Sequence, residues 1–258
     1  MTPPPIRKPP GIRKGDVVGV VAPAGALTEE RLQIGLAILE GWGLVPRIGA
    51  SVLAREAYLA GADGLRHADL QAVLDDPEVR AVFCARGGYG SQRIVPQLDW
   101  QALRRAPKAI IGYSDTTAVL SAALAAGVVA VHGPMVADDM AKGLTARSVT
   151  HLHRLLSDPA YLWEIELPHV VRPGRARGRL VGGCLSVLVT LLGTSWAPDT
   201  DGAILFLEDV HERPFRLDRL LTQLRQAGKL DRVSGLVFGS MARCPEVDGT
   251  GPLQVVEA

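Results

Sequence analysis

The chain has 258 residues, of which 47% are hydrophobic and 21% charged, the composition of a soluble globular protein with a substantial core. Its 28 basic and 27 acidic residues leave a net charge of +1, which excludes a general electrostatic attraction to nucleic acid or to anionic membranes. The local basic cluster Arg175, Arg177 and Arg179 lies beside Pro173 and Gly174, and we interpret it as a solvated linker.

The three cysteines, Cys84, Cys184 and Cys244, have no close or CxxC spacing. They argue against a disulfide framework and against a zinc site, and they are compatible with a reducing cytoplasm. The N-terminal stretch "MTPPPIRKPPG" has no apolar core of a signal peptide, and no run approaches 18 apolar residues. We therefore expect a cytoplasmic protein without a transmembrane helix and without a bound metal.

The first half of the chain alternates strand-like and helix-like segments. The run "DVVGVVAP" (16–23) is typical of a buried parallel strand, and Thr28 precedes a helix whose apolar stripe includes Leu32 and Leu36. Further expected strands lie at 43–49, 79–85, 108–113 and 128–133, and further expected helical stretches at 64–76, 91–105 and 116–127. This alternation predicts an α/β fold with a doubly wound parallel sheet of the Rossmann or flavodoxin type.

The second half has a different pattern. A helix is expected near 145–157, followed by a mixed stretch rich in Pro and Arg. Beyond it we expect an apolar helix entered by Gly-Gly (180–194), a strand (202–210), an amphipathic helix (215–228) and a strand (233–241). These patterns predict an N-terminal domain over 1–145, a linker region over 146–178 and a smaller C-terminal domain over 179–258.

Three unusual stretches follow directly after predicted strands, where ligands of α/β sheets gather. The first is "RGGYG" (86–90), whose glycines permit positive φ and let backbone N–H groups face a ligand or an oxyanion. The alternative is a tight strand–helix turn without a binding role. A dinucleotide fingerprint is not matched, because GxGxxG with a later acid is absent.

The second stretch is "GYSD" (112–115). A serine on a sharp strand-to-helix turn exposes its hydroxyl above the sheet, and the N–H of Asp115 at the helix start can stabilise an oxyanion. The pattern departs from GxSxG, because Thr116 stands at the position of the second glycine. The alternative is that Ser114 is only the N-cap of the following helix.

The third stretch is "LFLEDVHERPFRLDR" (205–219), in which Glu208 and Asp209 end an apolar strand. Glu208 is suited to stabilise a catalytic imidazolium, although acids at strand ends are common on surfaces. His132 follows the fourth strand and is either a rim residue or a base. Tyr89 and Tyr113 either line a pocket or belong to the core.

Together these stretches resemble one known family. The segments "GDVVGVVAPAG", "ARGGYGSQRIVPQLDW", "IIGYSDTTAVLSAAL", "VHGPM", "GRLVGGCLSVLVTLLGT" and "ILFLEDVHERPFRLDRLLTQLRQAG" occur in the order found in the LD-carboxypeptidase family of serine peptidases, over about residues 15–240. That family hydrolyses the bond between an L-centre and a terminal D-amino acid. Its best-known role is removal of D-alanine from murein tetrapeptides during cytoplasmic cell-wall recycling.

The resemblance implies Ser114 as nucleophile, Glu208 as the acid of a triad, and the N–H groups of Gly87 and Asp115 as the oxyanion hole. It also implies a homodimer, a small peptide substrate, no cofactor, and neither a nucleic-acid nor a membrane partner. A sister group with the same motifs hydrolyses microcin-type peptidyl-nucleotides. Arg86, beside the glycine loop, is a hypothetical partner for the substrate carboxylate. We also expect Tyr89 and Tyr113 to lie near the peptide.

Two positions depart from the family pattern. Cys184 stands where the family usually carries Asn, and Cys is a poorer hydrogen-bond donor. The histidine of the triad, which the family carries in a C-terminal Gly-His motif, has no counterpart here. Three explanations are open: a truncated sequence, a base supplied by another histidine such as His132 or His211, or an inactive binding protein that keeps the pocket without the chemistry.

Overall fold

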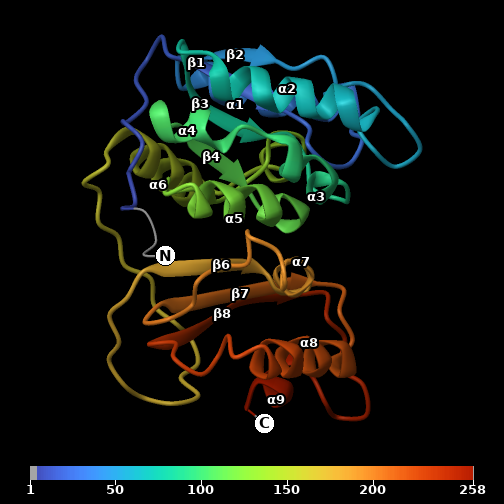
Figure 1. Cartoon of the computed structure of the whole chain (residues 1–258), viewed down its shortest axis with the longest axis vertical. Coiled ribbons are helices and arrows are strands. Elements are labelled where there is room, and N and C mark those ends of the chain that lie inside the picture. The colour runs from blue at the N-terminus through green and yellow to red at the C-terminus, as the bar shows by residue number, and fades with distance from the viewer. Residues whose placement is uncertain (1–4, 258) are drawn as a thin grey trace. The chain divides into compact units, whose positions relative to one another are not determined.

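The computed structural model describes residues 5–257 and divides the chain into two compact units, Met1–Leu162 and Trp163–Ala258 (Figure 1). The helix α6 (Ala146–Ser157), which the sequence analysis places in the linker region, counts with the first unit. Its buried Leu152 and Leu156 belong to the same apolar cluster as side chains of the first sheet.

The first unit is built on a five-stranded parallel sheet. Its strands are β1 (Val17–Val21), β2 (Val45–Ile48), β3 (Val79–Cys84), β4 (Ala109–Gly112) and β5 (Val131–His132), in the order β2-β1-β3-β4-β5. This order is the flavodoxin-like form of the doubly wound fold, so the predicted fold class is confirmed. The order reverses between β1 and β3, and ligands of open α/β sheets bind beyond the carboxyl ends of the strands at such a reversal.

Helices cover both faces of this sheet (Figure 1). On one face lie α1 (Glu29–Gly41), α6 and a π-helical turn (Val136–Met140). The helices that pack together on the other side are α2 (Asp63–Asp75), α3 (Ser91–Ile94), α4 (Trp100–Arg105) and α5 (Thr117–Ala125), with a 3-10 turn (Val95–Gln97) between α3 and α4. The predicted helical stretch over 91–105 is thus broken into short pieces, as expected.

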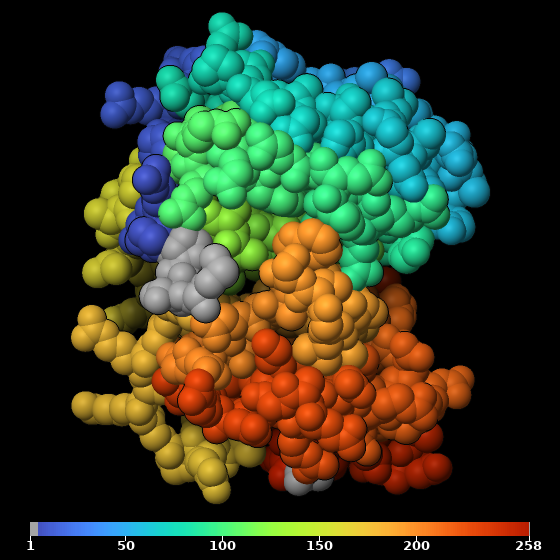
Figure 2. Space-filling model, viewed as in Figure 1, coloured from blue at the N-terminus to red at the C-terminus, as the bar shows by residue number. Residues whose placement is uncertain are grey.

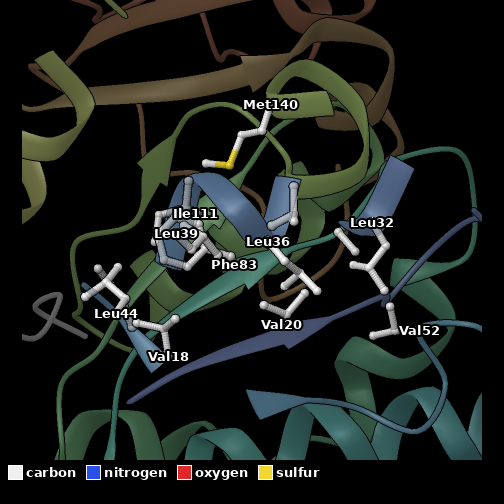
Figure 3. Close-up of a cluster of buried hydrophobic side chains, with 14 of the residues drawn as sticks. Val18, Val20, Leu32, Leu36, Leu39, Leu44, Val52, Phe83, Ile111 and Met140 are labelled. Atoms are coloured by element: carbon white, nitrogen blue, oxygen red, sulfur yellow. The ribbon is translucent and has the colours of Figure 1, made fainter. Parts of the chain in front are cut away.

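Alternate residues of the central strands fill the core beneath α1. Val18 and Val20 of β1, Phe83 of β3 and Ile111 of β4 are fully buried with Leu32, Leu36 and Leu39 of α1 (Figure 3). Burying each such side chain contributes about 1.5–3 kcal/mol to folding. The carboxyl ends of β1, β3 and β4 are therefore fixed relative to one another by a dense apolar layer.

One strand of the first unit is shorter than predicted. The run 128–133 was expected to form a whole strand, but only Val131 and His132 pair with β4. Val128 instead forms an isolated bridge with Arg7. The start of this apolar run therefore pairs with the N-terminal segment instead of with β4.

The second unit has its own parallel sheet, in the order β6-β7-β8, formed by β6 (Leu180–Cys184), β7 (Ile204–Val210) and β8 (Gly235–Ala242). Its helices are α7 (Leu185–Thr190), α8 (Pro214–Gln226) and α9 (Pro252–Glu257). The prediction of a helix over 180–194 was wrong at its start, because 180–184 is a strand. Gly182, with φ of 137°, lets β6 lie against the backbone of Phe206, which a side chain would obstruct.

The segment 163–179, which leads into β6, forms neither helix nor strand, and its residues are exposed. Figure 2 shows side chains of this yellow part of the chain as separate protrusions. Across residues 5–257, no helix has both the length and the apolar character needed to cross a membrane.

Candidate active site

Ser114 lies on a strained corner at the end of β4. The strand ends at Gly112, a 3-10 turn follows over Ser114–Thr116, and α5 begins at Thr117. Ser114 has φ of 59°, in the left-handed region that residues other than glycine rarely adopt. Strain of this kind concentrates at functional sites, and a serine on a strained strand-to-helix turn is the geometry of a hydrolase nucleophile.

Ser114 does not occupy a helix-cap position, which was the alternative role considered for it. Tyr113 precedes the 3-10 turn and Thr116 precedes α5, and neither position has a capping bond from a side chain. Within residues 5–257, the Ser114 hydroxyl makes no hydrogen bond, and the residue is half-buried. The hydroxyl is thus available to a substrate.

Thr116 explains the departure from the GxSxG pattern. Its hydroxyl donates to the carbonyl oxygen of Tyr113 at 2.8 Å, and its backbone N–H donates to the same oxygen at 3.3 Å. The side chain is fully buried and lies over Gly112, where an added Cβ would collide with the Thr116 hydroxyl. Threonine therefore closes the corner that a second glycine leaves open in the more common motif.

The glycine loop after β3 lies directly against Ser114. A Cβ added to Gly87 would stand 3.0 Å from the Ser114 Cβ and 3.1 Å from its Oγ, so only glycine fits there without displacement. Gly88 and Gly90 have φ of 112° and 124°, which also require glycine. The carbonyl oxygen of Gly87 accepts a hydrogen bond from the Gly25 N–H at 2.9 Å.

Two backbone N–H groups beside the serine are available to a ligand. The Gly87 N–H donates to no group in residues 5–257, while its carbonyl is fixed by Gly25. Asp115 is the second residue of the 3-10 turn, a position whose N–H has no partner within the turn. A carbonyl group attacked by the Ser114 hydroxyl would therefore have two N–H groups nearby that are suited to stabilise its developing oxyanion.

A pair of hydrogen bonds ties the start of α3 to this corner. The Ser91 N–H donates to the Asp115 carboxylate at 2.9 Å, and the Ser91 hydroxyl donates to the Asp115 carbonyl at 2.6 Å. Both residues are buried. The Asp115 side chain thus has a structural task, and only its backbone N–H is free for chemistry.

The remaining residues predicted in the first unit lie around the same edge. The Tyr113 hydroxyl donates to Asp139 at 3.0 Å, and its ring lies 5.7 Å from the ring of His132. Arg86 donates to the carbonyl oxygen of Ala26, which occupies part of its guanidinium. Tyr89 is half-exposed and makes an edge-on contact with Tyr58 at 5.8 Å between ring centroids.

Glu208 belongs to the second unit, near the carboxyl end of β7. Along this strand Leu205, Leu207 and Asp209 are buried, whereas Phe206 and Glu208 point to the opposite, less buried face. Burial, with a smaller contribution from the charge of Asp209, raises the pKa of Glu208 from 4.5 to about 7. A carboxyl group with this pKa responds to a neighbouring cation by ionising.

Asp209 has a different task from Glu208. Its carboxylate accepts hydrogen bonds from the Ser186 N–H at 2.8 Å and the Ser186 hydroxyl at 3.3 Å, and so binds the first turn of α7. The Cys184 thiol, 3.7 Å from the same carboxylate, adds a weak donor. Burial raises the pKa of this thiol to about 12, so Cys184 is present as the neutral thiol.

The histidines considered as alternative bases differ in their surroundings. His211 Nε2 lies 3.3 Å from a guanidinium nitrogen of Arg243, and it must accept this bond because arginine only donates. This contact with Arg243 occupies the Nε2 atom of His211. His132 is paired in register with Gly112, two residues before Ser114.

One buried charge in this region was missed by the sequence analysis. Arg66 of α2 is fully buried and donates to three backbone carbonyl oxygens, those of Pro23, Gly61 and Gly90. The signal was present in the sequence, because Arg66 precedes Leu70 and Val73 on the apolar stripe of its helix. A charge at a core position of such a stripe indicates a specific partner.

Comparison with known proteins identifies the family. Residues 18–133 match the LD-carboxypeptidase N-terminal domain, and residues 177–257 match the LD-carboxypeptidase C-terminal domain. A putative carboxypeptidase of Streptomyces coelicolor is 48% identical over 96% of this chain and 81% of its own length. The chain belongs to the LD-carboxypeptidase family, as the sequence resemblance predicted.

Two further relatives carry names that describe a substrate. A probable murein peptide carboxypeptidase of Bacillus subtilis is 38% identical over 93% of this chain and 76% of its own length. The murein tetrapeptide carboxypeptidase of Pseudomonas aeruginosa is 36% identical over 88% of this chain and 77% of its own length.

Solved structures share the fold. The muramoyltetrapeptide carboxypeptidase of Oxalobacter formigenes superposes with a TM-score of 0.82 at 30% identity, over 93% of this chain and 82% of that one. The microcin self-immunity protein MccF, in complex with glutamyl sulfamoyl guanosine, superposes with a TM-score of 0.86 at 22% identity, over 96% of this chain and 84% of that one. The second likeness concerns the fold alone.

Proposed function

We propose that this chain is a serine-type LD-carboxypeptidase that removes a terminal D-amino acid, D-alanine, from murein tetrapeptides. The observation that carries the proposal is the contact of Gly87 with Ser114, a strained serine flanked by two available N–H groups. Membership of the LD-carboxypeptidase family and the names of the relatives from Bacillus subtilis and Pseudomonas aeruginosa support the choice of substrate.

In the proposed reaction, the Ser114 Oγ attacks the carbonyl carbon of the residue before the terminal D-alanine. A base takes the serine proton and delivers it to the leaving amine. The tetrahedral oxyanion accepts hydrogen bonds from the N–H groups of Gly87 and Asp115. The acyl-enzyme is then hydrolysed, and Glu208 stabilises the protonated base in both steps.

The substrate contacts are part of the same proposal. The free carboxylate of D-alanine needs a cation, and Arg86 is the guanidinium beside the glycine loop. Tyr89, within this loop, and Tyr113, next to Ser114, are proposed to contact the peptide through their rings. We also propose that the protein is cytoplasmic and forms a homodimer. Size-exclusion chromatography with light scattering tests the dimer.

The proposal is tested with L-Ala-γ-D-Glu-diaminopimelate-D-Ala as substrate, by measuring released D-alanine. The full chain should release D-alanine and become labelled at Ser114 by a fluorophosphonate probe, and Ser114→Ala should lose both activities. Undiminished release of D-alanine by Ser114→Ala overturns the assignment of the nucleophile. Saturable binding of the tetrapeptide without release or labelling favours a binding protein instead.

A second candidate function is hydrolysis of a microcin-type peptidyl-nucleotide. The similarity of this chain to MccF is the reason to consider it. MccF of Escherichia coli is 26% identical over 87% of this chain, below the identity of the murein peptide relatives. Offering the tetrapeptide and an aminoacyl sulfamoyl adenosine at equal concentration separates the two. We expect turnover of the tetrapeptide alone.

The base is tested separately. Among the histidines of the first unit, His132 is the candidate because its ring lies beside Tyr113. If His132 takes the serine proton, His132→Gln should reduce fluorophosphonate labelling as strongly as Ser114→Ala does. Labelling at the rate of the unaltered chain excludes His132.

A further inference from the structure

Two buried cations of the first unit each donate to three backbone carbonyl oxygens. One lies at the amino ends of the parallel strands and the other at their carboxyl ends. Lys108 precedes β4 and donates to Val73, Leu74 and Asp76 at 2.8, 2.6 and 2.6 Å, which closes the C-terminal end of α2. Arg66 is the second buried cation, and it lies at the carboxyl ends of the strands, where the loops after β1, β2 and β3 begin. Lys108 and Arg66 are thus alike in charge, burial and number of carbonyl partners, but only Arg66 lies near the glycine loop.

Arg66 holds three loops with one guanidinium. Its Nε donates to Gly61 at 3.2 Å, in the loop after β2. One terminal nitrogen donates both to Gly90, at 3.0 Å in the glycine loop, and to Pro23 in the loop after β1. The other terminal nitrogen pairs with Asp63. A planar fork of five donors satisfies these partners, which an ammonium group cannot span in the same way.

These bonds reach the Ser114 corner through the glycine loop. Pro23 lies two residues before Gly25, whose N–H fixes the carbonyl of Gly87 at 2.9 Å. Gly90 lies three residues after Gly87 and approaches Arg66 so closely that a Cβ there would stand 3.0 Å from the guanidinium nitrogen. The backbone that follows the Gly87 N–H is thus held at two points, the carbonyls of Gly87 and Gly90, by segments that Arg66 connects.

We infer that Arg66 is a positioning residue that sets the Gly87 N–H against Ser114. The inference rests on the proposed function, because it assigns that N–H to the oxyanion. Arg66 does not touch the substrate in this account; it acts through Gly90 and Pro23. A displacement of about 1 Å at a reacting group lowers a rate by about 100-fold, so a small shift of the loop has a large effect.

The test compares Arg66→Met with Lys108→Met in the full chain. Arg66→Met should lower kcat for D-alanine release by about 100-fold, with KM within about threefold, because the lost interaction concerns the transition state. Lys108→Met should lower the unfolding temperature and leave kcat within about twofold. Both variants are assayed at a temperature where circular dichroism shows them folded.

A second measurement does not depend on hydrolysis. In 15N-glycine-labelled protein, Arg66→Met should shift the amide signals of Gly87 and Gly90, and Lys108→Met should leave them in place. Unmoved signals in Arg66→Met, or an equal loss of kcat in both variants, overturn the inference. Should Arg66→Met not fold, Arg66→Lys carries the same two measurements with the same outcomes.

The two readouts also separate this inference from the proposed function. If Ser114→Ala still releases D-alanine, the assigned nucleophile is wrong, and the glycine amide signals still decide whether Arg66 positions the loop. If the signals stay in place while Ser114→Ala is inactive, the positioning role is wrong and the nucleophile stands.

Discussion

The hydroxyl of Ser91 donates to the backbone carbonyl of Asp115 at 2.6 Å, while the Ser91 N–H donates to the carboxylate of the same residue at 2.9 Å. Ser91 follows the glycine loop and Asp115 follows the candidate nucleophile. This pair of bonds therefore joins the two segments that would supply the oxyanion hole.

Replacing Ser91 by Ala should destabilise the chain by about 1–3 kcal/mol, since the buried Asp115 carbonyl loses its donor. Denaturant unfolding measures this loss. Ser157→Ala is the control, because its hydroxyl makes only an exposed contact of 3.5 Å with Arg154. That control should change stability by less than about 0.5 kcal/mol. Equal effects of the two substitutions would contradict the prediction.

Ser114→Gly should make the chain more stable while removing its activity. Glycine adopts the left-handed φ of 59° without the steric cost that serine carries, which is about 1 kcal/mol. Ser114→Ala keeps this cost and should leave stability unchanged. Thermal unfolding of the three proteins gives the comparison. If Ser114→Ala raised the unfolding temperature as much as Ser114→Gly, backbone strain would not be the cause of the added stability.

Gly87→Ala should slow fluorophosphonate labelling of Ser114, because the added methyl group would stand only 3.0 Å from the serine Cβ and 3.1 Å from its Oγ, closer than ordinary van der Waals contact. Gly41→Ala, in open space near the end of α1, is the control and should label at the normal rate. Labelling rates are followed by intact-protein mass spectrometry. Normal labelling of Gly87→Ala would mean that the loop relaxes away from the serine.

Glu208 should make stability depend on pH. Its pKa is raised from 4.5 to about 7 in the folded chain, so the folded state binds more protons than the unfolded state within this interval. The contribution of Glu208 to stability is fully present below about pH 4.5 and is lost as pH rises through about 7. Glu208→Gln should therefore match the unaltered chain at pH 4.5 and exceed it in stability at pH 8.

Urea unfolding at these two pH values measures the effect. A difference between Glu208→Gln and the unaltered chain that is the same at pH 4.5 and pH 8 would show that Glu208 has an ordinary pKa. In the same samples D-alanine release should be absent from the variant at every pH, since glutamine cannot stabilise a protonated base.

The cysteines should differ in their reaction with iodoacetamide at pH 8. Cys84 and Cys184 are buried, and burial raises the pKa of each thiol to about 12, which keeps them unreactive. Cys244 is less buried and should be alkylated first. Peptide mass spectrometry locates the label, and early labelling of Cys184 would contradict its burial against Asp209.

Much of the fold followed from periodicity in the sequence. The continuous apolar runs at 16–23 and 79–85 predicted β1 and β3, because a strand buried on both faces needs no polar alternation. The run at 180–194 misled for the same reason, since apolar character alone does not distinguish a strand from a helix. Gly182 was the signal that the backbone of β6 lies close to a neighbour.

The candidate site could be predicted only in part. Ser114, Gly87 and Asp115 stand in short motifs after strands, and sheet topology brings such motifs to one edge. Arg66 and Asp139 lie in no motif, because partners such as the carbonyls of Pro23 and Gly90 and the hydroxyl of Tyr113 are far away in the sequence. Such partners are known only once the chain has folded.

The bonds around the glycine loop also make the serine a reporter of folding. Pro23, Gly61, Gly90 and Asp115 are spread over more than a third of the chain, and all of them must be in place before the loop takes its position. On the proposed function, a chain emerging from the ribosome would therefore acquire a reactive Ser114 only after Asp115 and the segments before it have folded together. Pulse labelling with a serine-directed probe would record the moment at which the first unit completes its assembly.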